Sequence, residues 1–269
     1  MSIPILLLIV APYAVTATAY LESRRRREAP PRWARSVGAA TVLVHLAALV
    51  LLGKESRHSP FHTESQALSF LAFSLAGVYV VLEATSRIAA YGGGFHALAA
   101  LLCAVSVPGL STQACLIATT PPDRLVTWHV GFALLGTAAL LAGGLLGFGY
   151  LGAYRRMKSD VLAPPGPEGP SLTGLARLSR DASLASLVLL APSLVLGAQV
   201  SLRADAHGAW TLVELALSAV EFALALAAFV VWWRVPRRGV LAARLAVLAT
   251  LVAIGGFAIV HPFVTRAGG

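Results

Sequence analysis

The chain has 269 residues, of which 57% are hydrophobic and only 12% are charged, and its mean hydropathy is +0.76. A soluble domain carries about 25% charged residues, so this composition excludes an ordinary soluble protein and predicts an integral membrane protein whose main partner is membrane lipid. The net charge of +9 does not predict nucleic-acid binding, because the basic residues lie in short segments between long apolar runs.

Eight apolar runs of roughly 16 to 27 residues follow one another along the chain, and each is of a length that can cross a bilayer as a helix. They cover residues 2–20, 37–53, 66–85, 95–110, 125–151, 182–202, 209–233 and 241–264. Such continuous runs predict an all-α fold: one integral membrane domain over residues 1–269, built as a polytopic bundle of about eight transmembrane helices. They do not show the alternation of a membrane β-barrel.

The positive charge predicts the orientation of these helices. Fifteen of the 21 lysines and arginines lie in the four segments that follow the first, third, fifth and seventh runs, and a sixteenth, Arg244, lies near the inner end of the eighth run. Because such residues remain on the cytoplasmic side, we expect both termini outside. The longest inner segment, 152–181, is expected to be a cytoplasmic loop with a proline-rich linker at Ala163–Pro170 and a short interfacial helix over 172–180.

Two histidines are predicted to lie at the outer ends of their helices. His129 follows Trp128 at the start of the fifth run, and His261 is near the end of the eighth run. Two imidazoles at one membrane level suit bis-histidine ligation of a haem iron, and Trp128 and Trp210, at the same level, would line a flat macrocycle. The alternative is ordinary, because tryptophan is enriched at membrane interfaces and an interfacial histidine can face water.

Further ionisable residues are predicted inside the bilayer. His45 lies about 12 Å below the outer end of the second run, where its ring needs either a hydrogen bond to a neighbouring helix or a cofactor. His96 is expected to reach the inner interface. Glu221 is near the middle of the seventh run, on one face with Glu214, and is expected to be protonated or paired with His45 or Arg244.

Several short segments resemble a known family, the cytochrome c assembly proteins of the CcsA/CcmC/HemX type. The resemblance is best from residue 125 onward and rests on the apolar run opened by His129, on the position of His261, and on the segments Leu175–Asp181, Ser186–Gln199 and Trp232–Gly239. It implies that His129 and His261 are haem ligands, and His45 is similar, more weakly, to a histidine of an early span. The loop Arg203–Thr211 has one tryptophan where haem-delivering members have a tryptophan-rich motif, so the chain is most similar to the HemX-like branch.

The resemblance implies a haem-binding, haem-handling factor without enzymatic turnover, in a bacterial inner (plasma) membrane, with cytochrome c assembly or haem-synthesis proteins as partners. Two alternatives stay open. A b-type cytochrome subunit linked to quinone would need histidine pairs at both membrane levels. A small proton-coupled transporter would use Glu221 and His45.

Overall fold

The computed structural model describes residues 3–26, 28–56, 63–86, 88–112, 124–159, 170–203, 209–234 and 238–267. The described residues are almost entirely helical and contain no strand, which confirms the predicted all-α class. The helices are α1 (Ile3–Arg26), α2 (Arg32–Ser56), α3 (Glu64–Thr85), α4 (Gly92–Thr112), α5 (Arg124–Ser159), α6 (Leu172–Arg203), α7 (Ala209–Arg234) and α8 (Gly239–Ala267), with one 3-10 turn, η1 (Ala89–Tyr91).

Seven of these helices, α2 to α8, are long and apolar enough to cross a membrane, within the residues that the structure describes. In α1 the side chains of residues 3–7 are not described, so the eighth span stays a prediction. The reason for the helical fold is that a chain in lipid must satisfy its backbone N–H and C=O groups internally, which an α-helix does.

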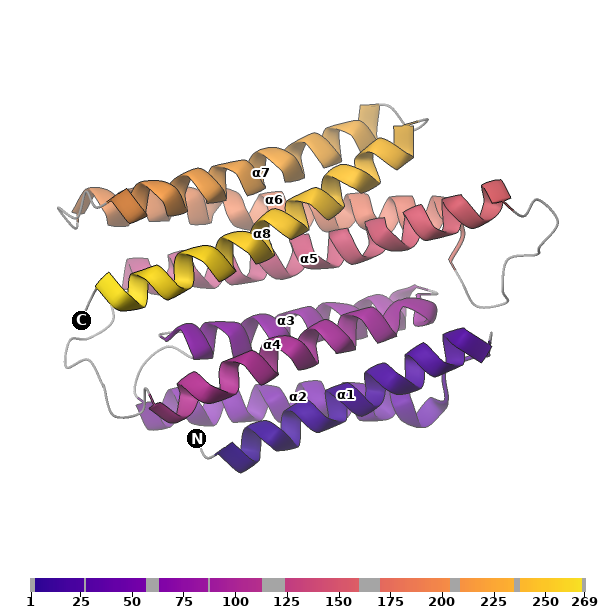
Figure 1. The fold of residues 1–269 in the computed structure, drawn as a ribbon, viewed down its shortest axis with the longest axis horizontal. Coiled ribbons are helices and arrows are strands. Elements are labelled where there is room, and N and C mark those ends of the chain that lie inside the picture. Colours follow the sequence, from indigo (N-terminus) through magenta and orange to yellow (C-terminus); the bar gives the residue numbers. More distant parts are fainter. Residues whose placement is uncertain are drawn as a thin grey trace. The chain divides into compact units, whose positions relative to one another are not determined.

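The helices make their contacts within two compact units, α1–α4 and α5–α8, and each unit is described by itself (Figure 1). The sequence predicted one membrane domain over residues 1–269, without this internal division. In both units consecutive helices pack side by side, as short connections between membrane spans require.

The inner segment 152–181 is shorter than predicted, because α5 continues to Ser159 and α6 already begins at Leu172. The expected interfacial helix over 172–180 is wrong as a separate element, since it is the first part of α6. Leu175 and Ser179 on it are buried, and the Ser179 hydroxyl donates to the Gly143 carbonyl oxygen of α5 at 3.1 Å. The linker 163–170 lies outside the described residues except for Pro170.

Small residues bring the helices of the second unit into close contact. Gly136 of α5 packs against Leu190 of α6, and Gly144 packs against Thr250 of α8. The Thr250 hydroxyl donates to the Leu140 carbonyl oxygen at 3.0 Å. Lipid tails are as apolar as leucine, so membrane helices associate through close packing and interhelical hydrogen bonds of this kind.

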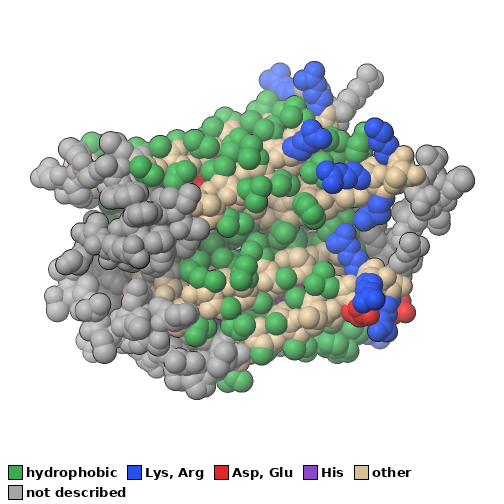
Figure 2. Space-filling model, in the orientation of Figure 1, with side chains coloured by type: hydrophobic (Ala, Val, Ile, Leu, Met, Phe, Trp, Pro, Cys, Tyr) green, Lys and Arg blue, Asp and Glu red, His purple; other side chains and the backbone are tan. Residues whose placement is uncertain are grey.

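Basic side chains gather at helix ends in both units, while apolar side chains cover the helix lengths (Figure 2). The last turn of α1 carries Arg24, Arg25 and Arg26, and the last turn of α5 carries Arg156 and Lys158. These ends are the ones predicted to face the cytoplasm, and the side of the membrane that they face stays a prediction.

We expect Gly144→Ala to destabilise the second unit. A Cβ at this position would lie 2.7 Å from the Thr250 Cβ and closer still to its hydroxyl, so Thr250 would have to move and give up its bond to Leu140. Such overpacking costs about 1–3 kcal/mol. The measurement is the temperature at which the purified protein in detergent stops being monodisperse. The matched control is Gly152→Ala in the same helix, where a Cβ meets nothing within 4 Å and the helix gains up to about 1 kcal/mol.

The predicted orientation determines which epitope tags antibodies can reach before the membrane is permeabilised. A tag fused before Met1 should be labelled without permeabilisation, whereas one inserted in the 160–169 segment should be labelled only after it. Equal labelling of both tags would contradict eight spans with an external N-terminus.

Candidate functional site

His129 lies on the second turn of α5 and is held against α6 by three contacts to Ser193. Its Nδ1 atom lies 2.8 Å from the Ser193 carbonyl oxygen and 3.2 Å from the Ser193 hydroxyl. The Ser193 hydroxyl also lies 3.2 Å from the His129 carbonyl oxygen and donates to it. The histidine is therefore fixed in position by a serine on the neighbouring helix.

Gly197 of α6 provides the room for the imidazole ring. A Cβ at Gly197 would lie 2.7 Å from His129 Cε1 and 3.1 Å from Nδ1, so only glycine leaves the ring where it is. Ser193 and Gly197 are four residues apart and therefore share one face of α6. Neither residue was predicted from the sequence as part of the site. The sequence pattern that could have indicated them is a pair of small residues one helical turn apart, in the span that follows the span of His129.

The bond to a carbonyl oxygen determines which nitrogen carries the proton. A carbonyl oxygen only accepts, so Nδ1 is the donor and Nε2 of the neutral ring keeps its lone pair. Among the residues that the structure describes, no hydrogen bond to Nε2 is present. Metal-binding histidines commonly have this arrangement, in which one nitrogen donates to a backbone carbonyl and the other binds the metal.

The packing of α5 against α8 sets the level of residue 261. The two helices run antiparallel, because Leu140 and Gly144 contact Thr250 while Gly147 contacts Ala243 and Ala246. His129 is eleven residues before Leu140, and His261 is eleven residues after Thr250. Both steps correspond to about 16 Å along a helix axis, so the two residues lie at one level near the same end of the unit.

The remaining residues of the predicted haem site are only partly described. The side chains of His261, on α8, and of Trp210, on the first turn of α7, lie outside the described ones. Trp128 is 63% exposed and stacks on Phe132, with ring centroids 5.9 Å apart. Its exposed ring is thus directed outward from the unit rather than into the α5–α6 contact that holds His129.

His45 is fully buried within the α1–α4 unit, and both of its ring nitrogens have partners. Nδ1 lies 3.2 Å from the Tyr13 hydroxyl, and Nε2 lies 2.9 Å from the Ser69 hydroxyl. This is the predicted hydrogen bond to a neighbouring helix, made twice. Neither nitrogen of His45 is therefore available to bind an iron or to pair with Glu221.

Two further predictions concern His96 and Glu221. His96 was expected to reach the inner interface, and this is wrong: it is 1% exposed, and its ring lies between Tyr13, Tyr20 and Tyr79. Glu221 of α7 is half-buried and faces α8, with Oε1 3.6 Å from the point that a Gly256 Cβ would occupy. In the described part of the chain it has no ion pair with Arg244.

No cluster of three or more histidine, cysteine, aspartate or glutamate side chains occurs among the described residues. Among the described side chains, the site therefore offers one oriented imidazole, that of His129, and the backbone of residue 261 on α8 lies at the same level. A haem iron takes one or two axial ligands from the protein, whereas a structural zinc ion is held by four ligands.

Comparison of the chain with known protein families, with curated proteins and with solved structures finds no match in any of the three. The class of protein therefore follows from the fold alone. The chain is an all-α, multi-pass membrane protein, with seven described helices of spanning length and apolarity.

We expect Gly197→Ala to displace the His129 ring and break its bond to Ser193. The new Cβ would overlap the ring, and the change should lower the free energy of unfolding by about 1–3 kcal/mol. The ¹⁵N chemical shifts of histidine-labelled protein in lipid report the tautomer directly. Gly255→Ala, where a Cβ meets nothing within 4 Å, is the matched control. An unchanged His129 spectrum in Gly197→Ala would contradict the described packing.

Proposed function

We propose that this chain is a haem-binding factor of cytochrome c assembly that holds haem near the outer face of the membrane through His129 and His261. The observation that carries the proposal is the 2.8 Å contact between His129 Nδ1 and the Ser193 carbonyl oxygen. It fixes the tautomer in which Nε2 is a ligand and orients the ring before any cofactor binds.

Three features support a haem group at this end of the α5–α8 unit. His129 has one nitrogen satisfied and one available. The antiparallel register of α5 and α8 supports a second ligand from residue 261 at the same level. Trp128 adds an exposed aromatic surface at this end of the unit, and Trp210 is the second residue of α7. When bound, haem would supply an iron with two axial positions and a one-electron redox couple.

The chain's own contribution is to bind and orient, and we propose no substrate turnover. Ser193 and Gly197 act as positioning residues, because they determine where the His129 ring lies and which nitrogen is protonated. His45 is not among the proposed ligands, since both its nitrogens are bound. We further propose a bacterial plasma membrane as the location and other cytochrome c assembly or haem-synthesis proteins as partners.

The test is the visible spectrum of the detergent-purified protein after haem is added, oxidised and reduced. The wild type should show the low-spin spectrum of a bis-histidine haem. His129→Gly and His261→Gly should each lose it, and added imidazole should restore it by filling the space that the missing ring leaves. Tyr154→Phe, at an exposed tyrosine 25 residues further along α5 than His129, is the control.

Three outcomes would contradict the proposal. They are a spectrum that survives both glycine variants, a spectrum lost equally in the control, and no haem binding by folded wild-type protein.

A further inference from the structure

The α1–α4 unit contains a line of buried polar side chains that the proposed haem site does not use. The line begins at Glu83, near the end of α3. Both Glu83 carboxylate oxygens lie 2.8 Å from the Tyr20 hydroxyl of α1, and Oε1 lies 3.3 Å from Arg35 Nε of α2. The Glu83 side chain is 14% exposed and that of Arg35 is 45% exposed, so this group is in contact with the basic end of the unit.

The other end of the line is the group Tyr13, His45 and Ser69, which is joined by the two hydrogen bonds of the His45 ring. Polar residues continue from it toward the start of α3, where Ser65 and Gln66 are buried and Thr63 caps the helix. Ser69 and Glu83 are fourteen residues apart on α3, which is about 21 Å. The line thus extends through most of the thickness of the hydrocarbon layer.

His96 of α4 lies between the two groups. Its ring centroid is 5.7 Å from that of Tyr20 and 5.9 Å from that of Tyr13. The ring also lies against Gly38 of α2, where a Cβ would be 3.0 Å from both Cε1 and Nε2. The four helices of the unit therefore converge on this histidine.

Two fully buried polar atoms near Gly38 have no hydrogen bond within the described chain: His96 Nδ1 and Thr16 Oγ1 of α1. Leaving such an atom without a partner costs about 1–3 kcal/mol, and native proteins avoid this cost by binding water internally. The two atoms lie where the line of polar side chains passes from Tyr20 to Tyr13, so they are placed to hold water there.

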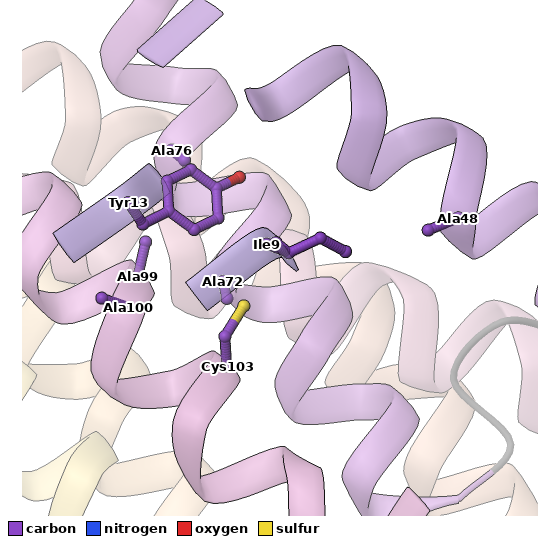
Figure 3. Close-up of a cluster of buried hydrophobic side chains, with 8 residues drawn as sticks. All are labelled: Ile9, Tyr13, Ala48, Ala72, Ala76, Ala99, Ala100 and Cys103. Atoms are coloured by element: carbon purple, nitrogen blue, oxygen red, sulfur yellow. The ribbon is translucent and has the colours of Figure 1, made fainter. Parts of the chain in front are cut away.

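Apolar side chains enclose the outer half of the line. Tyr13 belongs to a cluster of buried residues from all four helices, shown in Figure 3: Ile9, Tyr13, Ala48, Ala72, Ala76, Ala99, Ala100 and Cys103. This enclosure keeps bulk water away from the buried Tyr13–His45 pair.

We propose that α1–α4 carry a proton path along Glu83, Tyr20, His96, Tyr13, His45 and Ser69, completed by internal water bound at His96 Nδ1 and Thr16 Oγ1. The path is a function separate from haem binding and uses none of the residues of the α5–α8 site.

Each side chain of the path gains one proton and releases one, so its number of protons is unchanged. A hydroxyl accepts a proton on its oxygen lone pair while its own proton leaves to the next group. An imidazole accepts a proton on one nitrogen and releases the proton of the other, and the return of the original tautomer completes the cycle. Glu83 exchanges protons with water at the basic end, where Arg35 stabilises its carboxylate.

The test is proton flux into liposomes that contain the purified protein and a trapped pH-sensitive dye, driven by a potassium gradient with valinomycin. Wild-type protein should acidify the lumen faster than protein-free liposomes do. Tyr13→Phe removes the hydroxyl bound to His45 and should lower the flux to that of protein-free liposomes. Tyr154→Phe, at an exposed tyrosine of α5, should conduct like the wild type.

A second pair of variants tests the internal water. Thr16→Val replaces the buried hydroxyl with a methyl group of similar size and should lower the flux, while Thr18→Val, on the exposed side of α1, should not. A wild-type flux equal to that of protein-free liposomes overturns the path. A flux unchanged in both Tyr13→Phe and Thr16→Val does so as well, and would make the polar line a purely structural network.

Discussion

A hydrogen-bonding group inside a bilayer has no water to bond, and the rest of this structure depends on how the chain meets that constraint. The backbone meets it by forming helices. Polar side chains meet it by reaching a carbonyl oxygen of another helix, as Ser179 does at Gly143 and Thr250 at Leu140. Each such bond also joins two helices, so the same contacts that satisfy polar atoms fix the register of the bundle.

That register is what makes the α5–α8 unit a candidate site. Close packing at Gly136, Gly143 and Gly144 sets how α6 and α8 lie along α5. Ser193 and Gly197 of α6 then meet His129, and residue 261 of α8 comes to the same level. The candidate ligand pair is therefore a consequence of small residues about two to four turns away from His129.

The histidines of the chain show how one residue type takes different roles. His129 donates one proton to a carbonyl oxygen and keeps a free nitrogen, which suits a metal ligand. His45 uses both nitrogens in hydrogen bonds, which suits a relay or a structural contact and not ligation. His96 is enclosed by tyrosine rings and keeps an unbonded Nδ1, a costly arrangement unless water or a ligand completes it.

Hydropathy and charge along the chain were enough to predict the all-α class, the positions of the helices and the basic residues at particular helix ends. The reason is that the length, apolarity and positive charge of a segment are local properties of the sequence. The extension of α6 back to Leu172 was not predictable in this way, since it depends on burial of Leu175 and Ser179 against α5. The burial of His96 was not predictable in this way either. The same holds for the hydrogen-bond partners of His45, which are Tyr13 and Ser69, and for Ser193, the partner of His129. Those depend on which helix faces meet, and only the packing of distant segments decides that.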